Sequence, residues 1–244
     1  RNVVKNVGCA IIGQTKNLAP ADKKLYSIRD IVGTVESIPL ITSSILSKKI
    51  AAGLSSLIID VKVGNGSFNQ TQEIANNLAT SLVSVAKGAG LNCVGVLTDM
   101  NQVLGWNAGH TLEVMESIEY LTNIKKNIRL EQITNELLST LLSTIKKISK
   151  KDSLNQIQEV INNGKAAEKF EQMVAALGGP KNLLKDFDKL LFKAPFKEKI
   201  FAASSGFVSS IKTRKLGLLL IELGGGRKQT NDKIDFSVGF ENTV

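Results

Sequence analysis

The sequence predicts an α/β fold in which a mainly parallel mixed sheet is flanked by helices. Strand and helix patterns alternate along the first hundred residues, which is typical of parallel strands joined by helical crossovers. Only 5% of the residues are aromatic and 20 are glycines, so the core would consist of aliphatic side chains and the chain would turn often. With 43% hydrophobic residues among 244, it can bury a large core.

The predicted elements of the first half follow one another in a regular order. Residues 7–12 form a short apolar run, which predicts a buried strand. Residues 37–50 predict a helix, and residues 54–63 predict a second buried strand. An amphipathic helix over residues 71–87 then leads into a third strand over residues 92–97.

The second half is predicted to be mostly helical as far as residue 177, and the remainder changes character. Residues 206–211 predict a strand, residues 216–223 a helix and residues 234–238 a further strand. No linker or low-complexity segment separates this part from the rest. We therefore expect an α+β C-terminal tail attached to the sheet domain.

Composition also limits the class of function. The net charge is +9, but the basic residues lack the interleaved aromatics that single-stranded nucleic acid stacks on, so no nucleic-acid binding is expected. No apolar run approaches the roughly 20 residues of a membrane span, so no membrane association is expected either. Cys9 and Cys93 lie in apolar runs without metal-ligand spacing. They are interpreted as reduced thiols of a cytoplasmic protein.

The helix predicted over residues 37–50 has an unusual face. Ile41, Ser44, Ile45 and Lys48 fall on one stripe at helical spacing. A hydroxyl and an ammonium among isoleucines would offer a small polar-edged ring apolar contacts for its faces and donors for its rim. Spacing alone favours a plainer interpretation, in which Lys48 is an exposed cation stabilised by the dipole at a helix end.

Several longer motifs, in order along the chain, resemble one family. They begin with Val-Gly-Cys-Ala-Ile-Ile-Gly-Gln-Thr at residues 7–15 and continue through residues 29–49, 60–68, 97–102, 224–227 and 234–239. Through these motifs the chain resembles the thymidine and pyrimidine nucleoside phosphorylases from residue 7 to residue 240. The resemblance implies reversible phosphorolysis of a pyrimidine nucleoside, with thymidine as the expected substrate and 2-deoxy-α-D-ribose 1-phosphate as product. A broad-specificity pyrimidine nucleoside phosphorylase is the alternative.

The resemblance also assigns roles to particular residues. Arg29, Ser44 and Lys48 match the family residues that hold the pyrimidine ring. Arg29 and Lys48 are the catalytic candidates, because cations aimed at the ring would stabilise negative charge on the departing base. The remaining matches line the base pocket and are Tyr26, Ile41, Ile45 and Phe68.

The organisation of the whole protein is a further expectation from the resemblance. Residues 1–19 would begin the α/β phosphorylase domain, residues 20–52 would belong to a small helical, base-binding domain, and residues 53–244 would complete the α/β domain with its tail. The family's phosphate site, with a Lys-His-Ser motif, would precede this chain. We therefore expect a missing N-terminal part, phosphate as co-substrate without any cofactor, and a homodimer when full length.

Two other interpretations stay open. The first is a phosphoribosyltransferase of the same fold, against which the set of Arg29, Ser44 and Lys48 argues. The second is an inactive fragment that binds a base but lacks the phosphate site.

Other residues are weaker candidates. His110 is expected to start a helix or to pack, and residues 64–66 form either a tight turn or a loop that approaches a ligand. Leu104, Asn107 and Glu116 match positions that hold potassium in some relatives. Because position 107 is usually a small residue there, no metal is expected.

Overall fold

The computed structural model describes residues 2–13, 18–31, 36–229 and 231–243, and the side chains of residues 26–31 lie outside the description. The chain divides into two compact units, each of which is considered by itself. The sheet unit contains Ile12–Met100 and Thr134–Asn155. The helical unit contains the remaining residues.

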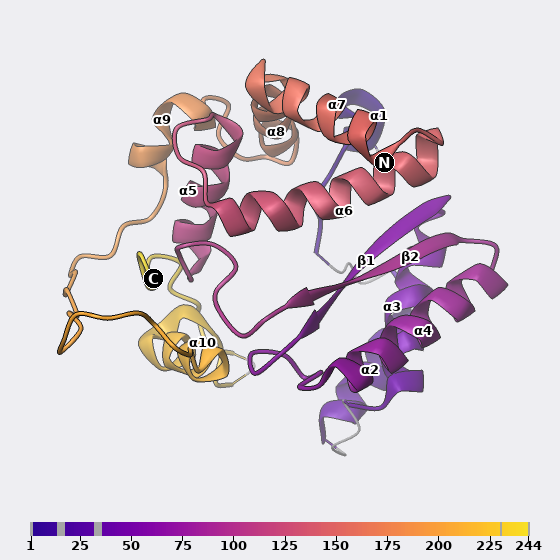
Figure 1. The fold of residues 1–244 in the computed structure, drawn as a ribbon, viewed down its shortest axis with the longest axis horizontal. Helices are drawn as coiled ribbons and strands as arrows, with labels where there is room; N and C mark the ends of the chain where they lie inside the picture. Colours follow the sequence, from indigo (N-terminus) through magenta and orange to yellow (C-terminus); the bar gives the residue numbers. More distant parts are fainter. Residues whose placement is uncertain (1, 14–17, 32–35, 230, 244) are drawn as a thin grey trace. The chain divides into compact units, whose positions relative to one another are not determined.

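The sheet unit is built on two parallel strands, β1 (Ser56–Val63) and β2 (Asn92–Asp99), which pair in register along their whole length. Helix α4 (Gln72–Gly88) connects them and covers one face of the sheet (Figure 1). It begins at Thr71, whose Oγ1 accepts a hydrogen bond from the Ile74 N–H at 3.3 Å. The cap satisfies one of the amides that every helix leaves unpaired at its first turn.

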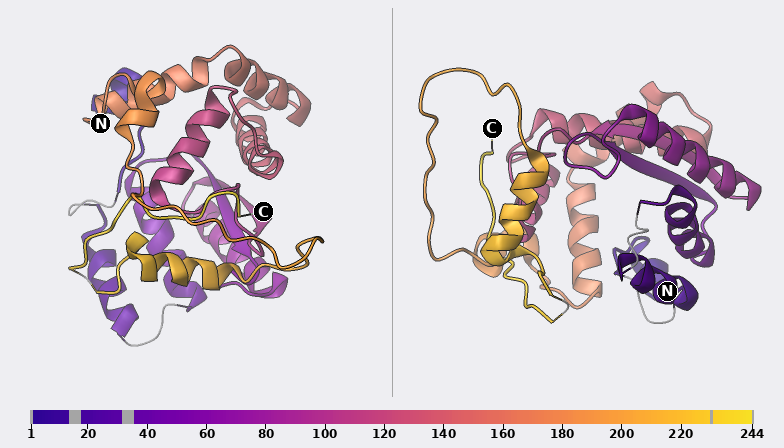
Figure 2. Two further views of the ribbon diagram at one scale, coloured as in Figure 1. Left: turned by 90° about the vertical axis from the view of Figure 1, so that its left-hand side faces the viewer. Right: turned by 90° about the horizontal axis from the view of Figure 1, so that it is seen from below.

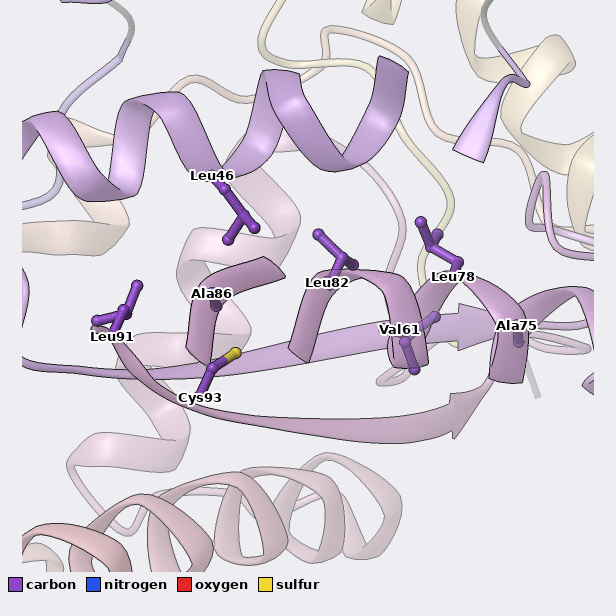
Figure 3. Packing of buried hydrophobic residues seen from close by; sticks show 9 residues of the cluster. Leu46, Val61, Ala75, Leu78, Leu82, Ala86, Leu91 and Cys93 are labelled. Carbon is purple, nitrogen blue, oxygen red and sulfur yellow. The ribbon is translucent and has the colours of Figure 1, made fainter. Parts of the chain in front are cut away.

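The core of the sheet unit lies between α4, the strands and α3 (Ile38–Ala51). Leu46 points from α3 towards α4, where Leu82 lies, and Cys93 lies on β2 (Figure 3). All three side chains are only 1% exposed. Burial raises the pKa of the Cys93 thiol, and the nearby Lys87 acts in the opposite direction.

Helix α2 (Pro20–Ile31) contacts α3. Helix α3 begins after Ser37, whose backbone is extended but whose side chain makes no capping hydrogen bond. A proline in its first turn fits there because that turn has no intrahelical amide bond to lose. The helix is therefore held in place between α2 and α4 by packing and not by a strong cap.

The helical unit consists of short helices. Helix α5 (His110–Leu121) contacts α8 (Lys165–Ala176) and α9 (Leu183–Leu190), and α1 (Asn2–Val7) contacts α8. Two longer helices each contribute residues to both units. They are α6 (Ile128–Lys146) and α7 (Lys150–Asn162).

The C-terminal part of the helical unit is largely irregular. Figure 2 shows an extended segment between α9 and α10 (Thr213–Leu220), and α10 continues into the π-helical turn η1 (Ile221–Gly225). Near its end the chain returns to the start of α5, where Ala108 and Phe240 form an antiparallel bridge. Within the described ranges, no helix is long and apolar enough to cross a membrane.

The predicted α/β class is confirmed, and so are four of the predicted elements. The helices over residues 37–50 and 71–87 and the strands over residues 54–63 and 92–97 all occur, each displaced by two residues or fewer at either end.

Three predicted strands are wrong. Residues 8–13 follow α1 as irregular chain, residues 206–211 are irregular, and residues 234–238 form no strand. A strand needs a hydrogen-bonding neighbour, and in the described part of the chain β1 and β2 pair only with each other. The helix predicted over residues 216–223 begins earlier and ends in the π-helical turn.

Leu46→Ala should destabilise the sheet unit by about 2–5 kcal/mol, because it opens a cavity between α3 and α4. Hydrogen exchange of the α4 amides reports on this unit and would measure the loss. The matched control is Ile50→Ala on the same helix, where the side chain is 45% exposed and the expected loss is below about 1 kcal/mol. Equal losses for the two variants would contradict the described core.

Candidate functional site

The polar face of α3 forms a connected cluster with α2. Lys48 Nζ donates to Asp22 Oδ2 at 2.6 Å and to Ser44 Oγ at 3.0 Å. Asp22 and Ser44 are buried, at 9% and 7% exposure, while the Lys48 side chain is 25% exposed. We call Asp22, Ser44 and Lys48 the α2–α3 cluster.

The predicted stripe on α3 therefore divides into two parts. Ser44 and Lys48 meet the carboxylate of Asp22, whereas Ile41 and Ile45 are partly buried and pack against the hydrophobic core. The plainer interpretation of Lys48 as a solvated cation is wrong for the described contacts, because its ammonium donates to both Asp22 and Ser44.

The other predicted base-site residues lie on different elements. Tyr26 and Arg29 belong to α2, but their side chains lie outside what the structure describes. Phe68 follows β1 in a loop and is 64% exposed. The structure thus brings Ser44 and Lys48 together, and the assembly of the full set stays a prediction.

A second polar cluster lies near the carboxyl ends of the strands. Asp60, Lys62 and Thr98 share one face of the sheet, opposite the face that α4 covers. The Thr98 hydroxyl donates to Asp60 Oδ1 at 2.5 Å and accepts from Lys62 Nζ at 2.9 Å. The same ammonium lies 2.7 Å from Asp60 Oδ2. Ligands of α/β sheets bind at this end of the strands.

Sequence reasoning did not predict this second cluster. Its residues lie within two of the motifs that carry the family resemblance, residues 60–68 and 97–102, but no role was assigned to them. The available signal was the strand period: residues 60 and 62 alternate onto one face, and position 98 stands beside position 62 in the register of the two strands. The register between β1 and β2 could not be predicted from a single sequence.

The loop after β1 is a closed turn. The N–H of Gly64 donates to Asn69 O at 3.0 Å, and the N–H of Gly66 donates to Met100 O at 3.0 Å. The hydroxyl of Ser67 and the side-chain amide of Asn69 both donate to the carbonyl oxygen of Lys62, at 2.8 and 3.1 Å. With both glycine amides committed to protein carbonyls, the turn interpretation fits better than a phosphate cradle.

Glu116 organises the segment before α5. Its carboxylate is 5% exposed and accepts the N–H groups of Trp106 and Asn107 at 2.8 and 3.1 Å. A Cβ at Gly105 would lie 2.3 Å from Glu116 Oε1, so a larger residue there would push the carboxylate away from the position in which it accepts these two N–H groups. Within the described residues, no group of three or more His, Cys, Asp or Glu side chains could hold a metal ion.

His110 starts α5, as predicted, and packs against the C-terminal segment. Its Nε2 lies 3.0 Å from the carbonyl oxygen of Gly225, and its ring meets Phe236 edge to face at 5.2 Å. These contacts are those of a structural histidine.

Comparison with known proteins covers nearly the whole chain. The model of the glycosyl transferase family a/b domain matches residues 1–167, and that of the pyrimidine nucleoside phosphorylase C-terminal domain matches residues 207–244. A thymidine phosphorylase of Colwellia psychrerythraea is 49% identical over 242 residues, which cover 99% of this chain and 55% of the relative. The chain therefore spans about half the length of this curated relative.

Glu116→Ala should destabilise the helical unit by about 2–4 kcal/mol, because two half-buried N–H groups lose a charged acceptor. Trp106 is the only tryptophan in the sequence, so its fluorescence reports on this segment directly. We expect the emission to shift to longer wavelength and the urea midpoint to fall. Glu159→Ala, on the exposed side of α7, is the control and should change neither. An unchanged spectrum for Glu116→Ala would show that the carboxylate does not hold the segment.

Proposed function

Because this chain belongs to the thymidine and pyrimidine nucleoside phosphorylase family, we propose that the whole protein catalyses the reversible phosphorolysis of thymidine. A phosphate oxygen attacks the anomeric carbon of the sugar, and the bond from that carbon to the ring nitrogen breaks. The products are thymine and 2-deoxy-α-D-ribose 1-phosphate. The bond electrons leave with the base, so negative charge grows on the pyrimidine ring during the step.

The observation that supports this proposal best is the α2–α3 cluster. Lys48 presents an ammonium that Asp22 and Ser44 hold in a defined position beside the apolar face of α3. A cation fixed in advance stabilises a developing anion more than it stabilises the neutral substrate, so it lowers the barrier. Arg29 is proposed to share this role, with its planar fork of donors directed at the ring.

The rest of the base pocket is proposed from the family match. Ser44 would hydrogen-bond the rim of the ring, and Tyr26, Ile41, Ile45 and Phe68 would contact its faces. Ile41 and Ile45 have the half-buried positions that such a role needs, with one side against the core. Phosphate acts as co-substrate, and the reaction needs no cofactor.

The setting of the enzyme is part of the proposal. We propose a homodimer in the cytoplasm, which light scattering of the whole protein and fractionation of cells would test. The two cysteines are free, which suits a reducing compartment. Similar rates with uridine and thymidine in side-by-side assays would favour the broad-specificity alternative.

Lys48→Ala in the whole protein should lower kcat for thymidine phosphorolysis by about 100-fold or more, the scale found when one preorganised donor facing a developing anion is lost. The neighbouring and exposed Lys49 supplies the control, since Lys49→Ala removes an equal charge from the same helix end. An unchanged kcat with a raised KM would mean that Lys48 binds the base without activating it.

Ser44→Ala should be milder, with a loss in kcat/KM corresponding to about 1–2 kcal/mol, because one neutral hydrogen bond is removed while the charges remain. Steady-state assays at saturating phosphate would measure it. A loss as large as that of Lys48→Ala would show that the hydroxyl, and not the ammonium, is the decisive donor.

A further inference from the structure

Asp22 is a buried carboxylate that the proposed reaction does not use. It lies in the first turn of α2, and its Oδ2 is 2.6 Å from the ammonium of Lys48, which belongs to the next helix along the chain. A buried charge is retained at a cost unless it is paired and hydrogen-bonded. Its pairing with the residue proposed to stabilise the departing base is the starting point for a specific role.

The geometry limits what the Lys48 ammonium can do. An ammonium has three N–H donors that rotate freely on a flexible stem. In the described contacts, one donor is taken by Asp22 and a second by Ser44. The tetrahedral geometry of the nitrogen then sets the direction of the third N–H. The Lys48 ammonium therefore points its remaining donor in one direction.

We propose that Asp22 is a positioning residue of the base site, which fixes the direction of the free Lys48 donor and couples α2 to α3. This inference rests on the proposed function of Lys48. Asp22 itself does not touch the substrate. It holds the Lys48 side chain in place before the reaction begins. The side chain then has no conformational freedom to lose in the transition state, which is the advantage of a preorganised donor.

Two effects of Asp22 oppose each other. Its negative charge partly neutralises the ammonium and weakens the field at the base, whereas its hydrogen bond holds the ammonium in place. Because a misplacement of about 1 Å can cost up to 100-fold in rate, while solvent screens the charge of the partly exposed Lys48 ammonium, we expect positioning to dominate. Removal of the carboxylate should therefore slow the reaction.

The test compares Asp22→Asn, Lys48→Ala and the double variant in the whole protein, under single-turnover conditions with saturating phosphate. Asp22→Asn should lower the rate by about tenfold or more with little change in KM. In the Lys48→Ala background the same substitution should have almost no further effect, because Asp22 acts through Lys48. Asp22→Glu, which keeps the carboxylate, should recover part of the loss. The control is Asp188→Asn, which breaks an exposed pair with Lys193 and should leave the rate unchanged.

A second readout separates positioning from folding. The fluorinated substrate 2′-deoxy-5-fluorouridine releases a more stable base anion, because fluorine withdraws electrons from the ring, so its reaction should depend less on Lys48. Asp22→Asn should therefore raise the ratio of its rate to that of thymidine. Both substrates are measured on one preparation, so a loss of folded protein lowers both rates alike and leaves the ratio unchanged.

The possible failures are distinguishable. No phosphorolysis of thymidine by the unmodified whole protein would overturn the proposed function. A full rate in Lys48→Ala would overturn the proposed role of Lys48, and the inference with it. A slowed Lys48→Ala together with an unaffected Asp22→Asn would overturn the inference alone. Equal losses from Asp22→Asn with and without Lys48, and an unchanged substrate ratio, would show that Asp22 has only a structural role.

Discussion

The packing of α3 against α4 is the contact on which the proposed site depends. Leu46 fills the space between the two helices, and Leu82 and Cys93 complete a core that excludes water. Burial of such side chains contributes about 1.5–3 kcal/mol each. Helix α3 has no side-chain cap at its start, so this packing and not the helix end determines its position. Because the apolar face of α3 is fixed against α4, the direction of its polar face is fixed as well.

The polar face of α3 follows from that constraint. Ser44 and Lys48 are four residues apart and therefore lie one above the other on the helix. Asp22 reaches them from α2 and holds the ammonium through a short hydrogen bond. Thr42 ties the same helix to α4 by a bond of 2.9 Å to Ser81. Apolar packing thus makes the helices rigid, and hydrogen bonds between the helices orient the Lys48 ammonium. A preorganised site needs both.

Local patterns in the sequence predicted the elements and contacts that are formed by residues close together along the chain. Helical spacing placed Ser44 and Lys48 together, and apolar runs located β1 and β2. The strand predicted over residues 206–211 was wrong because its aromatic and β-branched residues show only a propensity for strands, whereas a strand also needs a pairing partner that local sequence does not reveal. Asp22 was missed for the same reason, since its contact with Lys48 joins residues 26 positions apart on two different helices.

The most direct test of the proposed base site is a crystal structure of the whole protein with thymine and phosphate bound. We expect the Nζ of Lys48 and the Oγ of Ser44 to lie within about 3.2 Å of polar atoms on the ring, with the Lys48–Asp22 pair retained. A base bound elsewhere, or bound with Lys48 turned away and paired only with Asp22, would contradict the claim that this face of α3 activates the leaving group.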